Sequence, residues 1–114
     1  MSKQKELRLY EGMYILNASL SEDALKKSLE RITKSIEESG GEIHKIHEMG
    51  RKKLAYEING NRQGQYFLLF FSIDPTVLEE KWKEYHLNED LIRFVTMRAE
   101  KVLEKIEFKP LVEA

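Results

Sequence analysis

Gln65-Tyr-Phe-Leu-Leu-Phe-Phe-Ser-Ile73 is the most apolar stretch of this 114-residue chain, and the turn-forming residues 59–64 precede it. Aromatic and aliphatic side chains at adjacent positions are typical of a strand that is covered on both faces. Residues 7–17 have the same character, because apolar side chains occupy both sets of alternating positions there. We therefore predict that these two stretches are central strands of one sheet.

Helical periodicity follows each of these two strands. The first helix is marked by apolar residues at steps of four, three and four, namely Leu25, Leu29, Ile32 and Ile36. Ser19 or Ser21 caps its start, and Gly40-Gly41 ends it, since glycine tolerates a left-handed turn. Asp74-Pro75 opens the second helix with proline at the first position, where its missing N–H costs nothing. The apolar face of this second helix comprises Val77, Leu78, Trp82 and Tyr85.

Two more stretches complete the pattern of elements. Residues 42–58 read as a strand that Gly50 interrupts with a bulge or bend, and residues 91–99 read as a last strand. The order strand, helix, strand, strand, helix, strand predicts an α+β fold, the ferredoxin-like βαββαβ sandwich. Its four-stranded antiparallel sheet carries both helices on one face. We expect a flexible N-terminus over 1–6, the ferredoxin-like domain over 7–99, and a charged C-terminal extension over 100–114.

Two helices on one face leave the other face of the sheet open. Neighbouring residues in a strand point to opposite faces, so we expect that the apolar residues of the central strands are divided between the two. On this ground we predict that at least one of five large side chains lies on the open face: Tyr10, Tyr14, Phe67, Leu69 and Phe71. An apolar open face on a small domain marks an interaction site.

Composition limits the classes of function. The chain has 19 cations and 20 anions, so bulk positive charge does not draw it to nucleic acid, and local clusters of cations matter instead. It has no cysteine, which excludes disulfides and thiolate metal sites. Neither a signal peptide nor a membrane span is expected, and a cytoplasmic protein is predicted.

No set of side chains has the pattern of a catalytic or metal site. His44 and His47 lie three apart in a predicted strand, so they should point to opposite faces and not share a metal ion. Adjacent glutamates on the helices diverge, and a glycine-rich phosphate loop is missing. We therefore predict a protein that is not an enzyme and needs no cofactor, metal or small-molecule substrate.

Cations gather at the second strand. Arg51-Lys52-Lys53 follows Gly50, and Arg62 lies close by in the predicted hairpin. Arg93 and Arg98 lie on the last strand, where alternation sends them to opposite faces. These residues form a candidate phosphate-binding patch. Beside them, Leu54, Tyr56 and Ile58 alternate onto one face of an edge strand, as core residues or as a partner-binding surface.

One alternative is a stand-alone RNA-recognition motif, which has the same order of elements. Gln63-Gly-Gln-Tyr-Phe-Leu-Leu-Phe70 aligns with the signature of its third strand and keeps Phe67 as one stacking aromatic. Gln65 replaces the other aromatic, and Gln63 replaces the basic residue. Two further alternatives share the fold: a small-molecule regulatory domain, with Gly12 and Gly50 as the candidate pocket glycines, and an acylphosphatase-like enzyme, whose anion loop would have to be residues 17–21.

Five blocks of sequence, in order and at similar spacing, resemble the family of the sixth protein of the bacterial small ribosomal subunit. They are Tyr10-Glu-Gly-Met-Tyr-Ile-Leu16, Gly40-Gly-Glu-Ile43, Gly50-Arg-Lys-Lys-Leu-Ala-Tyr56, Gly64-Gln-Tyr-Phe-Leu-Leu69 and Leu87-Asn-Glu-Asp-Leu-Ile-Arg93. The resemblance implies a structural ribosomal protein that binds small-subunit (16S) ribosomal RNA as a heterodimer with small-subunit protein eighteen. By position, it implies RNA contacts for Arg51, Lys52, Lys53, Arg93 and Arg98. It also implies that Leu54, Tyr56 and Ile58 lie on the partner side.

Overall fold

The computed structural model describes residues 7–58 and 60–103. Six elements follow one another as the sequence predicts: β1 (Arg8–Asn17), α1 (Glu22–Glu38), β2 (Glu42–Ile58), β3 (Asn61–Ile73), α2 (Pro75–His86) and β4 (Leu91–Arg98). The predicted N-terminal segment 1–6 and residues 104–114 of the predicted extension lie outside the described residues.

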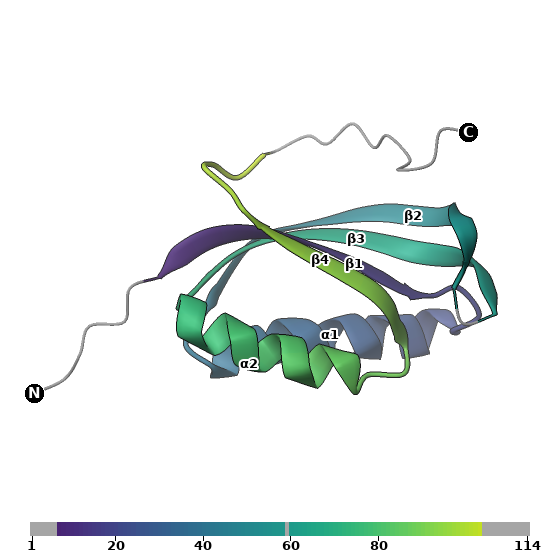
Figure 1. The fold of residues 1–114 in the computed structure, drawn as a ribbon, viewed down its shortest axis with the longest axis horizontal. Coiled ribbons are helices and arrows are strands. Elements are labelled where there is room, and N and C mark those ends of the chain that lie inside the picture. Colours follow the sequence, from purple (N-terminus) through teal and green to yellow (C-terminus); the bar gives the residue numbers. More distant parts are fainter. Residues whose placement is uncertain (1–6, 59, 104–114) are drawn as a thin grey trace, which may run out of the picture.

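The four strands form one antiparallel sheet in the order β2-β3-β1-β4, so the two most apolar strands are central and β2 and β4 are the edges. Both helices lie on the same face of this sheet (Figure 1). The predicted ferredoxin-like βαββαβ fold is confirmed. Within the described residues, neither helix combines the length and the apolar character that crossing a membrane requires.

The helix ends are fixed by local hydrogen bonds. Of the two predicted caps, Ser21 is the one used, because its hydroxyl accepts from the backbone N–H of Ala24 at 3.2 Å. Gly40 follows α1 with a φ of 88°, the left-handed conformation that glycine adopts most readily. Asp74 caps α2 by accepting from the N–H of Thr76 at 2.9 Å, and Pro75 takes the first helical position.

The main core lies between the sheet and the helices. All four apolar residues of the predicted α1 stripe pack there. The prediction that one or more of five large side chains lies on the open face was wrong: all five are buried beneath the helices, namely Tyr10, Tyr14, Phe67, Leu69 and Phe71. The register explains this result, because Tyr14 pairs with Phe67 and Tyr10 pairs with Phe71, and paired residues share a face. The alternate residues, Tyr66 and Ile15, face the other way.

Irregular pairing shapes the edge strand β2. Its register against β3 shifts at three places: between Ile43 and Lys45, between Glu48 and Gly50, and between Lys53 and Ile58. Gly50 has a φ of 83°, so the predicted interruption at this glycine is confirmed. Because a bulge can reverse which face the following residues occupy, the positions of the side chains on β2 depend on these shifts.

Candidate functional site

The sheet face opposite the helices carries a second, smaller apolar cluster, which we call the open-face cluster. Its buried members are Ile15, Leu54 and Tyr66, and Ile58 packs against them. Tyr56, by contrast, is 60% exposed. The three predicted partner residues thus lie beside one another, with two of them anchored in the cluster and one presented to solvent. A depression of about 180 Å³ opens there, lined by Ile15, Leu54, Ala55, Tyr56, Ile58, Tyr66 and Arg93.

Arg93 reaches this depression from the opposite edge of the sheet. It pairs with Ile15 of β1, and its Nη1 donates a hydrogen bond to the hydroxyl of Tyr56 at 2.5 Å. Burial raises the pKa of the Tyr66 hydroxyl, and the positive charge of Arg93 acts on it in the opposite direction. A guanidinium between two tyrosines above an apolar floor can bind a carboxylate, a phosphate or a backbone carbonyl of a partner.

The hairpin of β2 and β3 brings three of the predicted cations together. Lys52 pairs with Gly64 and Lys53 pairs with Gln63, so these two side chains point to opposite faces at the hairpin end of the sheet, and Arg62 adjoins Gln63 on β3. We call Lys52, Lys53 and Arg62 the hairpin cations. All three side chains retain contact with solvent, so phosphates can reach them.

Of the other predicted RNA-contact residues, Arg51 adjoins these cations, whereas Arg93 and Arg98 lie apart from them. Arg51 is exposed, but its Nη2 donates to the backbone carbonyl of Ala18 in the β1–α1 loop at 2.9 Å. Arg93 lies on the open face, whereas Arg98 pairs with Tyr10 at the far end of β1, on the helix side. The prediction that Arg93 and Arg98 point to opposite faces is confirmed.

Exposed apolar side chains on β4 extend the open face beyond the predicted residues. Val95 and Met97 alternate with the residues that point to the helices, and both are exposed. In the sequence, Val95 and Met97 follow Arg93 in steps of two. This spacing was the signal that could have placed all three side chains on the same face of the sheet. The open face therefore presents Tyr56, Val95 and Met97 as apolar contact points around Arg93.

His47 marks the other end of this face. Its ring packs edge-on against Phe70 at a centroid distance of 5.9 Å, and its Nε2 is 2.7 Å from the carbonyl oxygen of Leu103. His44 hydrogen-bonds to the hydroxyl of Ser72 at 2.7 Å. The prediction that the two histidines point to opposite faces was wrong, because the bulge after Ile43 turns both toward the open face.

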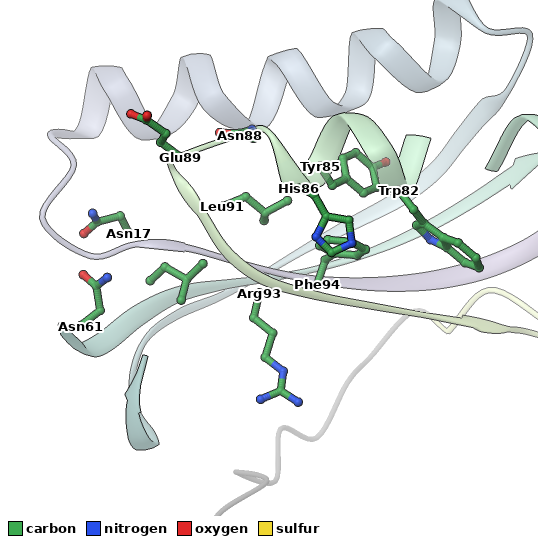
Figure 2. A pocket seen from close by; sticks show the side chains of 11 residues that line it. Asn17, Asn61, Trp82, Tyr85, His86, Asn88, Glu89, Leu91, Arg93 and Phe94 are labelled. Atoms are coloured by element: carbon green, nitrogen blue, oxygen red, sulfur yellow. The ribbon is translucent and has the colours of Figure 1, made fainter. Parts of the chain in front are cut away.

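A larger cavity of about 760 Å³ lies along the edge strand β4, between α2 and the β2–β3 hairpin, and the sequence interpretation missed it. Figure 2 shows Trp82 and His86 of α2 beside Phe94 of β4 at one end, with Asn17 and Asn61 at the other. Trp82 was assigned to the core face of α2, yet it is 36% exposed. Its position beside an edge strand, which leaves one flank uncovered, accounts for the difference.

The alternative functions of this fold find little support in these positions. Phe67, the one stacking aromatic kept from the RNA-recognition motif, is buried under the helices, so it offers no base-stacking surface. At Gly12 a Cβ atom would lie 2.8 Å from the Tyr14 ring, so no ligand pocket opens there. In the β1–α1 loop, the N–H of Ser19 donates to the Asn17 side chain at 2.9 Å instead of turning toward an anion site.

Comparison with known proteins agrees with this description. The family model described as ribosomal protein S6 matches residues 9–98. Small ribosomal subunit protein bS6 of Protochlamydia amoebophila is 56% identical over 110 residues, covering 96% of each chain. The protein of the same name from Chlamydia pneumoniae is 54% identical over 110 residues, covering 96% of this chain and 98% of that protein.

A solved structure shows the same similarity in three dimensions. The crystal structure of 30S ribosomal protein S6 from Thermotoga maritima superposes with a TM-score of 0.77 at 35% identity, covering 82% of this chain and 89% of that one. The family resemblance of the five sequence blocks is thereby confirmed, and with it the predicted location in the cytoplasm, on the ribosome. The chain belongs to the ribosomal protein S6 family and is a structural protein of the bacterial small ribosomal subunit.

Proposed function

We propose that this chain binds 16S ribosomal RNA as a heterodimer with small-subunit protein eighteen. The hairpin cations and Arg51 contact phosphates, and the open face of the sheet receives the protein partner through Leu54, Tyr56, Ile58 and Arg93. One observation supports this assignment: the solvent-accessible cations of the hairpin lie beside a sheet face that neither α1 nor α2 covers and that presents exposed apolar side chains. Exposed apolar groups next to cations suit a protein that touches a protein and RNA at once.

The overall charge supports a shared interface. The formal net charge is −1, so three or four local cations give only modest attraction to RNA. A basic partner seated on the open face would supply further phosphate contacts next to the hairpin. Arg98 lies at the other end of the sheet and on the helix side, so it is outside the surface that we propose.

The test is binding to a fragment that contains the central domain of 16S ribosomal RNA, measured with and without protein eighteen at several salt concentrations. We expect tight, salt-sensitive binding only when the partner is present. Arg93→Ala should weaken the heterodimer, and Arg98→Ala is the matched control on the same strand. Equal binding with and without the partner would point to an independent RNA-binding domain, and no binding in either case would reject the proposal.

A further inference from the structure

We propose that the cavity beside β4 receives an unpaired RNA base, which stacks on Trp82 and His86. This inference rests on the proposed RNA binding. It adds a second RNA contact, which lies beside β4 and is distinct from the hairpin cations. The ligand is a single extruded nucleotide. Its base enters the aromatic end of the cavity, and its phosphates stay at the rim.

The aromatic end of the cavity is held in place before any ligand arrives. The indole Nε1 of Trp82 donates to the hydroxyl of Thr96 on β4 at 3.3 Å, while the side chain remains 36% exposed. The ring of His86 lies 5.1 Å from that of Phe94 at an interplanar angle of 65°. Tyr85 packs behind Phe94, also at 5.1 Å. Rings that are fixed and partly exposed give a base a stacking surface at little cost in entropy.

Polar side chains line the rest of the cavity, namely the amides of Asn17, Asn61 and Asn88 and the carboxylate of Glu89. Asn17 and Asn88 use their side-chain oxygens locally, accepting from the N–H groups of Ser19 at 2.9 Å and Asp90 at 3.0 Å. Their amide nitrogens have no hydrogen-bond partner within the described part of the chain, and both side chains line the cavity. Donors of this kind match the carbonyl and phosphate oxygens of a nucleotide. The volume of about 760 Å³ is ample for one.

Continuity with the proposed RNA surface favours RNA over a peptide. Asn61 lines the cavity, and the next residue along the chain is Arg62, one of the hairpin cations. The stem of Arg93 forms part of the cavity wall, and its guanidinium extends away from the helices (Figure 2). A strand of RNA that leaves the hairpin would therefore meet the cavity next. An extended peptide added to the edge of β4 is the competing occupant.

The chain contains a single tryptophan, which gives a direct probe of this cavity. The protein is produced with 5-fluorotryptophan, and its one fluorine resonance is followed while unlabelled protein eighteen and then the central-domain RNA fragment are added. We expect little change with the protein partner and a shift with the RNA, because a stacked base changes the shielding of the indole ring. RNA affinity is measured in parallel by filter binding.

Matched variants separate stacking from folding. Trp82→Phe keeps an aromatic face and should retain nearly full RNA affinity, whereas Trp82→Ala should lose about tenfold. His86→Ala should weaken binding in the same direction. Leu87→Ala is the control, because Leu87 is 84% exposed at the end of the same helix and does not line the cavity. Thermal melting of each variant checks that it is folded.

The outcomes are distinct. A resonance that moves with protein eighteen and not with RNA would overturn the inference in favour of a peptide at the β4 edge. An unmoved resonance together with intact RNA affinity, in the parent and in Trp82→Ala, would overturn it and leave the proposed function standing. Loss of RNA binding by the unaltered protein with its partner would overturn both.

Discussion

The hydroxyl of Tyr56 on β2 accepts a hydrogen bond from Nη1 of Arg93 on β4 at 2.5 Å, which joins the two opposite edges of the sheet across its open face. The sequence interpretation placed Tyr56 on the partner side and Arg93 on the RNA side. Because the two side chains are in direct contact, a partner that displaces Tyr56 in the proposed heterodimer would also release the guanidinium of Arg93. We therefore expect partner binding at Tyr56 to change the contacts that Arg93 can make.

This contact should appear as a coupling energy in a double-mutant cycle. Tyr56→Phe, Arg93→Ala and the double variant are unfolded in urea, and the free energies of unfolding are compared. We expect a coupling of about 0.5–1 kcal/mol, below the roughly 1.5–3 kcal/mol of buried hydrogen bonds to charged groups, because Tyr56 is exposed. Strictly additive effects would mean that the contact does not contribute in solution.

The hairpin cations should control the salt dependence of RNA binding. Lys53→Gln and Arg62→Gln remove charges that face solvent, so each should reduce the slope of log K against log salt by about 1 and weaken binding to all RNA sequences alike. The measurement is RNA binding with protein eighteen from low to high salt. Arg98→Gln is the control at the far end of the sheet, and an equal loss of slope there would contradict a patch at the hairpin.

Arg51 should differ from Lys53 in its effect on stability. The sequence analysis treats the run Arg51-Lys52-Lys53 as one part of the candidate phosphate-binding patch. In the structure, Arg51 donates to the carbonyl of Ala18, so Arg51→Gln should lower the free energy of unfolding by about 1 kcal/mol. Lys53→Gln should change it by less than about 0.5 kcal/mol, as expected for an exposed site. The free energies of unfolding of both variants are measured in urea. Equal stability of the two variants would mean that Arg51 does not stabilise the fold and that its only proposed role is RNA contact.

The predictable part of this fold is the part that local chemistry determines. The cap of α2 at Asp74 and the helical stripe of α1 depend on residues within a few positions of one another, and they appear where the sequence placed them; the cap of α1 is Ser21, one of the two serines that the sequence offered. Simple alternation also holds along this part of β1, because Tyr10 and Tyr14 share one face and Ile15 takes the other. Each of these features can be deduced from one segment at a time.

The errors arose where two segments had to be aligned. The face taken by Phe67 follows from its pairing with Tyr14, 53 positions earlier, and alternation within a single strand does not contain that register. The bulge after Ile43 reverses the alternation that separated His44 from His47. The contact of Tyr56 with Arg93 spans the whole sheet. The candidate site was therefore located by its charged residues, while its internal contacts required the tertiary structure.

Two buried tyrosines should make stability fall at high pH. The hydroxyls of Tyr14 and Tyr85 are 3.1 Å apart beneath the helices, and their rings pack edge to face at 5.3 Å. Burial raises the pKa of Tyr14 well above its ordinary range and raises the pKa of Tyr85 to about 12. In the unfolded chain a tyrosine ionises near pH 10, so between about pH 10 and 12 the unfolded state has released protons that the folded state still holds.

The sign of the effect follows from this difference in bound protons. The stabilisation is complete below about pH 10 and is lost as the pH rises through about 12, by about 2–3 kcal/mol for Tyr85 alone. Urea unfolding of the parent and of Tyr85→Phe from pH 8 to 12 measures it. The variant should start less stable, because the Tyr14 hydroxyl loses its partner, and should then decline less steeply, because one buried proton has been removed. Parallel curves would show that Tyr85 titrates as an exposed tyrosine does. In that case the hydroxyl pair would not be sealed from water in the folded protein.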